Sequence, residues 1–186
     1  MEDTDRRDIQ ACLAGDGDAF ARLVERYEPR IAELMWRFSR RPRECEELIQ
    51  DVFVEAYFAL AGYRGEAPLL HWLRRIATRV GYRFWQKREK RKRHVPLDGI
   101  ESLAGREDPP DPSAAAEILD NLLGRLKPDD RLVLMLHYFE GCSIREIAER
   151  TGWNEGVVKM RAHRARGKLR DIARRERLVE KIRWTS

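Results

Sequence analysis

SIREIAERTGWNEGVVKMRAHRARGKL, residues 143–169, has the pattern of two helices joined by a tight turn. Ser143 and Glu146 have the S-x-x-E spacing of a capping box, which satisfies two backbone N–H groups at a helix start. We expect this helix to end near Thr151, because Gly152 readily takes the left-handed conformation that stops a helix. Asn154 is a favoured N-cap for the second helix. The stretch therefore predicts a helix-turn-helix.

The second of these helices has one apolar and one basic face. Its apolar residues recur at helical spacing, at Val158, Ala162, Ala165 and Leu169. Its other side carries the candidate contacts to duplex DNA, which are Lys159, Met160, Arg161, His163, Arg164 and Arg166. Such a helix fits the major groove, where its side chains reach phosphates and base edges. An ordinary amphipathic hairpin would show the same periodicity, but the coincidence of capping box, turn glycine and basic face favours DNA binding.

Charge is distributed unevenly along the 186 residues, whose net charge is +5. Residues 1–62 carry a net charge of −5 and residues 63–94 one of +9. Residues 95–128 then carry −4, and residues 129–186 carry +5. Two basic zones separated by acidic ones indicate two separate contacts with a polyanion.

The first basic zone reads as one long helix over residues 69–93, ending in KREKRKR. Helical spacing places Leu69, Leu73, Ile76, Val80 and Phe84 in the core, and it exposes Arg74, Arg75, Thr78, Arg79, Tyr82, Arg83 and Gln86. The zone interleaves its cations with Tyr63, Trp72, Tyr82 and Trp85, as a single-strand binder does to stack unpaired bases. Trp72 and Trp85 could equally belong to the core.

Another predicted helix runs from Pro42 to about Leu60. Its expected core residues are Ile49, Val52, Phe53, Ala56 and Leu60, and its opposite side shows Glu47, Gln50, Asp51 and Val54. This acidic side is either a solvated face or a docking surface for a basic partner. The periodicity alone does not decide between the two.

The remaining pattern is helical as well, so the fold class is all-α. We expect helices over residues 5–14 and 18–40, the latter capped by Asp18, and over residues 113–126 and 128–141. Residues 113–126 would bury Ile118, Leu119, Leu122 and Leu126. Residues 94–112 are acidic and rich in proline, which is typical of a linker. The sequence thus predicts two small helical domains, residues 1–93 and 113–186, with residues 174–186 prolonging the last helix before it frays.

Several function classes are disfavoured by the composition. No apolar run is long enough to span a membrane and the acidic N-terminus does not resemble a signal peptide, so we expect a cytoplasmic protein without membrane insertion. Cys12, Cys45 and Cys142 are far apart, which favours three buried thiols over a metal site or a disulfide. No cofactor-binding or catalytic motif is present, so we expect neither a cofactor nor an enzyme.

Three motifs in order resemble the small group-four, or extracytoplasmic function (ECF), sigma factors of bacterial RNA polymerase. EELIQDVFVEAY and YRGEAPLLHWLRRIATR resemble region 2, and residues 126–170 resemble region 4 down to the pattern G-x-V-K-x-R-x-H-R-A-R. The resemblance covers nearly the whole chain. It implies two helical domains that bind core polymerase and read a promoter.

The resemblance also implies a role for each surface. The side of the 42–60 helix with Glu47, Gln50, Asp51 and Val54 would meet the clamp coiled coil of core polymerase. The −10 element would be melted and held as a single strand by Tyr63, Arg64, Trp72, Arg75, Arg79, Tyr82 and Arg83. The helix-turn-helix would read the −35 element as a duplex, the linker would thread the polymerase cleft, and an anti-sigma factor is a further candidate partner.

The chain departs from the family pattern at a few positions that bear on promoter sequence. Arg79 stands in place of a usual Asn, Tyr63 in place of Phe, Met160 in place of Ser, and Trp153 in place of Ile. Two other classes remain as alternatives to a sigma factor. A one-component regulator would bind DNA as a dimer without polymerase and would not need the KREKRKR run, and an anti-sigma-type interaction protein would leave both basic zones unexplained.

Overall fold

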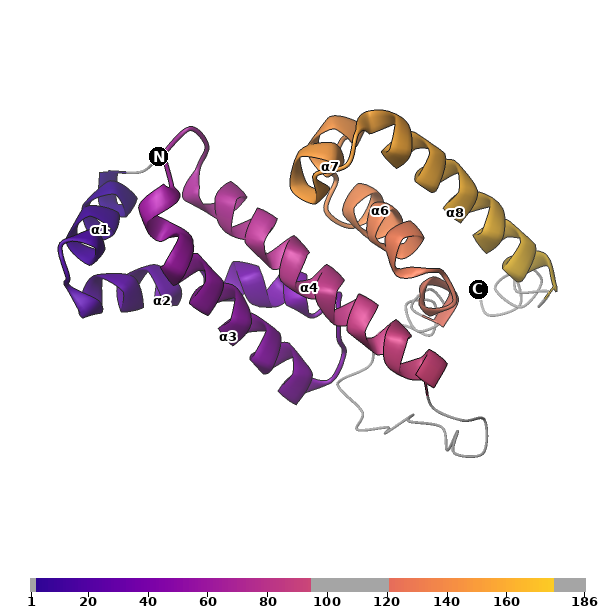
Figure 1. Ribbon diagram of the computed structural model, residues 1–186, viewed down its shortest axis with the longest axis horizontal. Coiled ribbons are helices and arrows are strands. Elements are labelled where there is room, and N and C mark those ends of the chain that lie inside the picture. Colours follow the sequence, from indigo (N-terminus) through magenta and orange to yellow (C-terminus); the bar gives the residue numbers. More distant parts are fainter. Residues whose placement is uncertain (1–2, 95–120, 176–186) are drawn as a thin grey trace, which may run out of the picture. The chain divides into compact units, whose positions relative to one another are not determined.

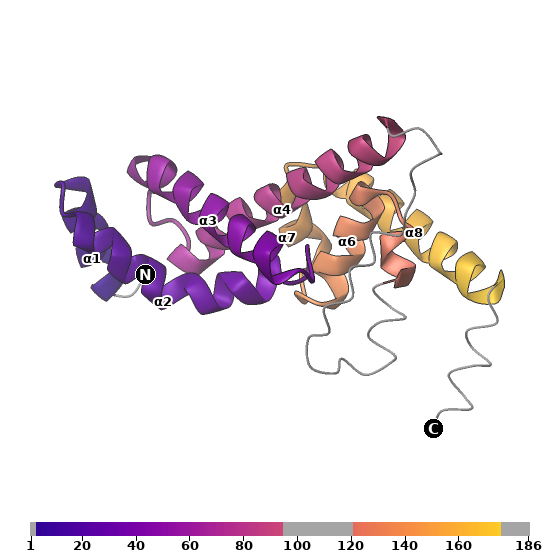
Figure 2. The same cartoon turned by 90° about the horizontal axis from the view of Figure 1, so that it is seen from below.

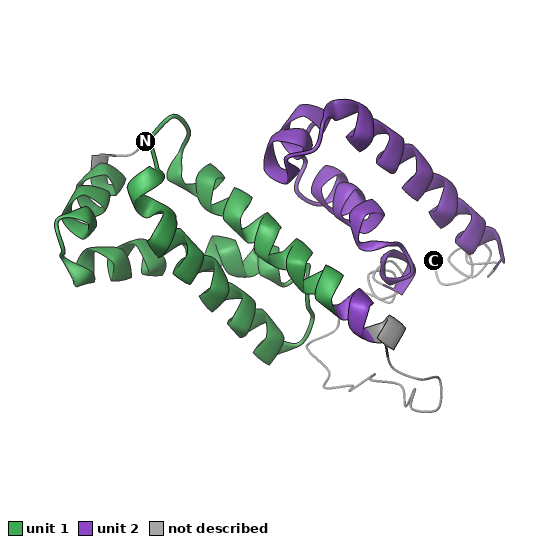
Figure 3. Cartoon of the chain, viewed as in Figure 1, with its two compact units in different colours: residues 1–87 green, residues 88–186 purple. Residues whose placement is uncertain are grey.

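The computed structural model describes residues 3–94 and 121–175, which form helices and no strand (Figure 1). This confirms the all-α fold predicted from the sequence. The chain divides into two compact units, residues 1–87 and 88–186 (Figure 3). The predicted linker and the C-terminal tail lie outside the described residues, apart from His94 at the end of α4 and two arginines at the end of α8. The predicted domain limits therefore stay predictions.

The first unit consists of α1 (Asp3–Leu13), α2 (Gly17–Met35), α3 (Pro42–Ala59), a 3-10 turn η1 (Leu60–Gly62) and α4 (Leu69–His94) as far as Lys87. The cap of α2 is Asp16 rather than the predicted Asp18, because the Asp16 side chain accepts from the N–H groups of Asp18 and Ala19. Helix α2 ends at Met35, earlier than predicted, where tighter backbone bonds bring Phe38 into the core.

Helix α4 packs closely against the segment that follows α2. The Phe38 and Trp85 rings lie 4.5 Å apart between centroids, and Trp85 Nε1 donates to the Phe38 carbonyl at 2.7 Å. A Cβ atom at Gly81 would collide with the Phe38 ring, so only glycine allows this approach. Of the two roles considered for Trp85, base stacking or core packing, the structure thus supports the core.

In α3 and α4, a few residues differ from the predicted pattern of buried and exposed positions. Thr78 was expected outside but is buried, since its hydroxyl donates to the Arg74 carbonyl one turn earlier. Ile49 and Phe84 were expected inside and are only half-buried. In α3, Leu48 takes the buried position instead, since the core stripe lies one residue earlier there.

Helix α1 is held to α2 by a network of buried charges. Figures 1 and 2 both show α1 folded back beside the start of α2. Asp5 and Asp8 are buried, and Arg26 donates to both, at 2.8 and 2.7 Å. Arg22 also donates to Asp8, and Tyr27 donates to Asp5. The hydrogen bonds from Arg26 and Arg22 hold the pKa of Asp8 below its usual value, so the carboxylate is charged at neutral pH.

The second unit contains α6 (Pro128–Tyr138), α7 (Ile144–Thr151) and α8 (Glu155–Arg175), preceded by helical residues 121–124. The capping box is confirmed, since Ser143 Oγ accepts from Glu146 N at 3.2 Å and Ser143 N donates to Glu146 Oε2 at 2.8 Å. Gly152 has φ +77°, and Asn154 Oδ1 accepts from a backbone N–H of α8. The helix-turn-helix therefore folds as predicted.

The core of the second unit joins α8 to α6 and to the preceding helical turn. Val158, Ala162 and Ala165 are buried as predicted, and Leu169 is half-buried. The turn at 121–124 buries Leu123 in place of the predicted Leu122, while Leu126 is buried as expected. The predicted core positions Ile118 and Leu119 lie outside the described residues.

The cysteines and the apolar content of the helices were also predicted from the sequence. Cys45 and Cys142 are buried thiols, whereas Cys12 is only half-buried and departs from the prediction. Among the described helices, none is both long and apolar enough to cross a bilayer.

Candidate nucleic-acid interfaces

The cations of α8 fall into two flanks on either side of Met160. At about 100° per residue, Arg161, Arg164 and Lys168 lie on one flank, and Lys159, His163, Arg166 and Arg170 lie on the other. Figure 1 shows α6 beside α8, and the first flank faces the first turn of α6. The two flanks therefore meet different surroundings.

The first flank is bound to two acids of α6. Asp130 has no exposed side-chain surface, and it accepts from Arg164 Nη2 at 2.7 Å and from Lys168 Nζ at 3.0 Å. Arg164 Nε lies 3.2 and 3.3 Å from the two oxygens of the same carboxylate. Burial alone would raise the pKa of Asp130, but the hydrogen bonds from Arg164 and Lys168 outweigh burial and lower it. The pKa of Arg164 is raised in turn, chiefly by its hydrogen bond to Asp130.

Arg161 is also engaged within the protein. It forms an ion pair with Asp129, and its guanidinium carbon lies 4.4 Å from the ring centroid of Trp153. Only 19% of its side chain is exposed. Arg161 thus has an intramolecular role, in which it joins α6 to the turn of the helix-turn-helix, and its predicted contact with DNA stays a prediction.

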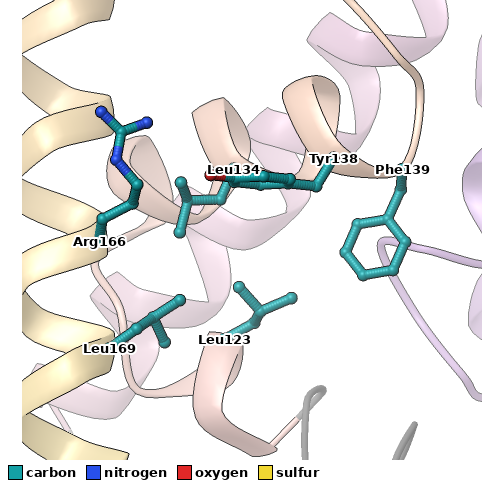
Figure 4. Close-up of a pocket in the computed structure, with 6 residues that line it drawn as sticks. All are labelled: Leu123, Leu134, Tyr138, Phe139, Arg166 and Leu169. Carbon is teal, nitrogen blue, oxygen red and sulfur yellow. The ribbon is translucent and has the colours of Figure 1, made fainter.

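The other flank presents accessible groups. Met160 and His163 are exposed, and Lys159 pairs with Glu155 at 3.6 Å in an exposed contact. Within the described residues, Arg166 makes no ion pair. Figure 4 shows Arg166 among the side chains that line an apolar pocket, together with Leu123, Leu134, Tyr138, Phe139 and Leu169. The volume of this pocket is about 410 Å³. The stem of Arg166 covers apolar surface, which leaves the charged end for an outside partner.

The basic face of α4 is less compensated than the first flank of α8. Arg75 and Arg79 are exposed one turn apart, and neither makes an ion pair within the described residues. Arg83 pairs with Glu55 of α3, and Tyr82 is half-buried. The predicted cationic face is thus exposed at Arg75 and Arg79, whereas Arg74 and Gln86, which were also expected outside, are half-buried.

The loop before α4 holds two predicted aromatic residues together. The Tyr63 and Trp72 rings lie 5.2 Å apart between centroids, and the Tyr63 hydroxyl donates to the Ala67 carbonyl. Burial raises the pKa of Tyr63, so its phenol stays protonated. Gly65 turns the loop with φ +71°, and Arg64 lies 4.0 Å from Glu66. Both rings remain half-buried, so part of each surface is accessible.

The acidic side of α3 is exposed as expected, at Glu47, Gln50, Asp51 and Val54. The structure adds aromatic residues that the sequence reading missed. Phe58 is 80% exposed, and Tyr57 is exposed beside it, in edge contact with Phe20. The spacing from Val54 to Phe58, one helical turn, could have revealed this extension.

Comparison with known proteins identifies the family. The family models "Sigma-70 region 2" and "Sigma-70, region 4" match residues 23–91 and 116–169. The chain is 30% identical to RNA polymerase sigma factor CarQ of Myxococcus xanthus, over 85% of this chain and 91% of that protein. It is 29% identical to ECF RNA polymerase sigma factor SigW of Bacillus subtilis, over 91% and 97%.

The chain belongs to the ECF sigma factors. The family resemblance seen in the sequence is thereby confirmed, and this sigma factor serves promoter-specific transcription initiation by RNA polymerase. Among solved structures, that of CnrH in complex with the cytosolic domain of CnrY has a TM-score of 0.57 and 25% identity, covering 91% of this chain and 97% of that one. The sigma factor RpoE of Bartonella quintana, at 23% identity and a TM-score of 0.62, shares the fold; it covers 83% of this chain and 96% of its own.

Proposed function

We propose that this sigma factor docks on core RNA polymerase through α3, holds the separated −10 strand against α4, and reads the −35 duplex with α8. The observation that carries the proposal is the presence of two basic helices in separate units, each with cations on the side away from its core. The protein acts in the cytoplasm and catalyses no reaction itself.

At the −35 element, the exposed side of α8 enters the major groove. Met160 and His163 lie at its centre, with Lys159 and Arg166 on the accessible flank. Arg164 reaches the groove from the other flank, since 44% of its side chain is exposed. Lys159 and Arg166 supply phosphate contacts, which hold the helix on the duplex irrespective of sequence.

At the −10 element, α4 and the preceding loop hold an unpaired strand. Arg75, Arg79 and Arg83 follow the phosphates together with Arg64 of the preceding loop. Tyr63, Trp72 and Tyr82 offer faces for unpaired bases. Stacking is worth about 1–3 kcal/mol per base, which offsets the few kcal/mol needed to unpair one. Arg79 stands at the position at which many family members carry Asn. A base contact there would therefore be made by a charged guanidinium instead of a neutral amide.

The surface of α3 fits the clamp coiled coil of core polymerase. It combines three polar residues, Glu47, Gln50 and Asp51, with exposed apolar side chains at Val54 and Phe58. Interfaces combine exposed apolar side chains with polar ones in this way.

Run-off transcription with purified core polymerase tests the overall proposal. Promoter-dependent transcripts are expected only when core polymerase and this protein are both present. Specific promoter binding by the protein alone, with no gain from core polymerase, would instead favour a one-component regulator.

Charge reversal on α3 tests the docking surface. The variant Glu47→Lys/Asp51→Lys should bind core polymerase at least about tenfold more weakly, mainly through slower association, because both side chains are exposed and rim charges steer encounter. Glu25→Lys/Glu28→Lys makes the same charge change on exposed positions of α2 and serves as the control. Equal losses in the two variants would refute the assignment to α3.

An anti-sigma factor is a further partner in this proposal. CnrH, which shares 25% identity with this chain, is found in complex with the cytosolic domain of another protein, CnrY. The exposed apolar surface of α3 is a site at which such a protein would compete with polymerase. Competition between the two for the protein is the expected behaviour.

A further inference from the structure

Asp130 of α6 is a buried carboxylate that forms ion pairs with α8, the helix proposed to read the −35 element. It lies in the first turn of α6, where the helix dipole favours a negative charge, and it is completely buried. Both of its ion-pair partners, Arg164 and Lys168, come from α8 and remain partly exposed. The acid is therefore shielded from solvent, while its cations extend from it toward the surface.

The hydrogen bonds to Asp130 use only one edge of the Arg164 guanidinium. Nε and Nη2 face the carboxylate, at 2.7 to 3.3 Å, and Nη1 takes no part in these bonds. Two donors on one carboxylate fix the plane of the guanidinium as well as its position. The other N–H groups of the guanidinium are left for an outside partner, and Arg164 follows the exposed Met160 by one helical turn.

Apolar packing also joins α8 to α6. Ala165 is buried in one cluster with Leu134, and Leu169 packs against that cluster, so the two helices have an apolar contact besides the ion pairs. A buried ion pair adds little net stability in general, and its best-supported use is to specify one geometry among several. The contact between Asp130 and Arg164 is thus better explained by orientation than by stability.

We propose that Asp130 is a positioning residue for promoter recognition, because it orients Arg164 for a bidentate contact with a guanine of the −35 element. Lys168 completes the arrangement by occupying the second carboxylate oxygen of Asp130. The inference rests on the proposed function of α8. It assigns sequence discrimination to the Asp130–Arg164 pair and general phosphate binding to Lys159 and Arg166.

The test is selection by the holoenzyme from a pool of duplex promoters with a randomised −35 region. Arg164→Ala should lower the preference at one or two base pairs by roughly 5- to 100-fold, the range expected for loss of one bidentate contact. Asp130→Asn should lower the preference at the same base pairs. The double variant should lose no more than the larger single loss, because the two residues act as one unit.

Two further variants separate positioning from folding and from charge. Glu155→Gln, which adds the same charge beside an exposed Lys159, should keep the wild-type preference. Arg164→Lys keeps the charge but lacks the planar fork, so it should lose preference at the same positions even if Asp130→Asn fails to fold.

Wild-type preference in Asp130→Asn or in Arg164→Lys, or a loss at other base pairs, would overturn the inference. Failure of the wild-type holoenzyme to enrich any −35 sequence would refute the proposed function itself, so the two failures are distinguishable.

Discussion

Helices α4 and α8 are both basic, yet the protein holds them in different ways. Helix α4 is anchored through its apolar side, where Gly81 and Trp85 meet Phe38, and Arg75 and Arg79 make no ion pair within the described residues. One cation of α4, Arg83, pairs with Glu55, whereas a whole flank of α8 is bound, because Asp129 and Asp130 pair with Arg161, Arg164 and Lys168. The two helices are similarly rich in Lys and Arg, but they differ in how much of that charge is left to bind a nucleic acid.

The difference fits two kinds of nucleic-acid contact. A single strand is flexible and is held by many uncompensated cations and by stacking. A duplex presents base edges in fixed positions, so the side chains that read it gain from being oriented beforehand. The ion pairs of α8 reduce the attraction of this helix for DNA, but they fix the orientation of its side chains. Arg75 and Arg79 of α4 keep their full attraction for phosphates.

The largest expected effect is on stability, and it comes from replacing one glycine by alanine in each helix. Gly81→Ala should destabilise the first unit by about 3 kcal/mol, because the new methyl group collides with the Phe38 ring. Gly167→Ala should stabilise the second unit by about 0.5–1 kcal/mol, because nothing lies within 4 Å of the added atom and alanine favours a helix. Thermal and urea unfolding of the full chain measures both, and a shift in the same direction would contradict this account of α4.

Next in size is the pH dependence of the ion pairs on α8. Asp130→Asn should lose about 1.5–3 kcal/mol of stability at neutral pH, the usual value of hydrogen bonds to a charged group. The pKa of Asp130 is lower in the folded state than in the unfolded one, so its stabilisation is present above about pH 4 and is lost as pH falls through the folded value.

The difference between wild type and Asp130→Asn should accordingly shrink in acid. Urea unfolding at a series of pH values measures it, with Asp171→Asn, an exposed acid on the same helix, as the charge control. A difference that stays constant down to pH 3 would show that the carboxylate charge is not involved.

The smallest effect concerns the salt dependence of binding. Arg75→Ala/Arg79→Ala should lower the slope of log K against log salt by about 1.4 for a promoter with an unpaired −10 region, at about 0.7 per phosphate contact. Arg161→Ala should leave the slope nearly unchanged, because Asp129 already compensates that charge. Fluorescence anisotropy of the holoenzyme at several salt concentrations measures both slopes, and equal decreases would mean that α4 and α8 present their cations alike.

Local rules of helix formation explain why so much of the fold could be predicted. The capping box at Ser143, the left-handed Gly152 and the apolar spacing of α8 depend on residues close together in sequence, and all three are confirmed. The start of α2 was misjudged because Asp16 and Asp18 are both good caps, and only the geometry of the Gly15 turn selects the first.

The surroundings of the charged residues could not be predicted in the same way. Periodicity places Arg161 and Arg164 outside the core, but it does not reveal acids more than thirty positions away in sequence. The Asp129–Asp130 pair looked like an ordinary helix start, because acids are common in a first turn. Thr78 was misplaced because a threonine can bury its hydroxyl by bonding to the preceding turn.

The central claim is that α4 holds an opened strand whereas α8 reads a closed duplex. It is tested most directly by transcription from two templates, a duplex promoter and the same promoter with a pre-melted −10 bubble. Tyr63→Ala and Arg75→Ala/Arg79→Ala should bind core polymerase normally and fail on the duplex template. They should recover much of their activity on the bubble, because the unpairing that these residues support has already been done.

Permanganate reactivity of unpaired thymines around −10 in the duplex promoter is the deciding measurement. Removing two cations of α8, in Arg166→Ala/Arg170→Ala, should reduce binding to both templates alike and serves as the control. The account predicts weak thymine reactivity in the α4 variants under conditions where the wild-type holoenzyme gives strong reactivity. Normal reactivity in those variants would contradict a role of α4 in opening the promoter.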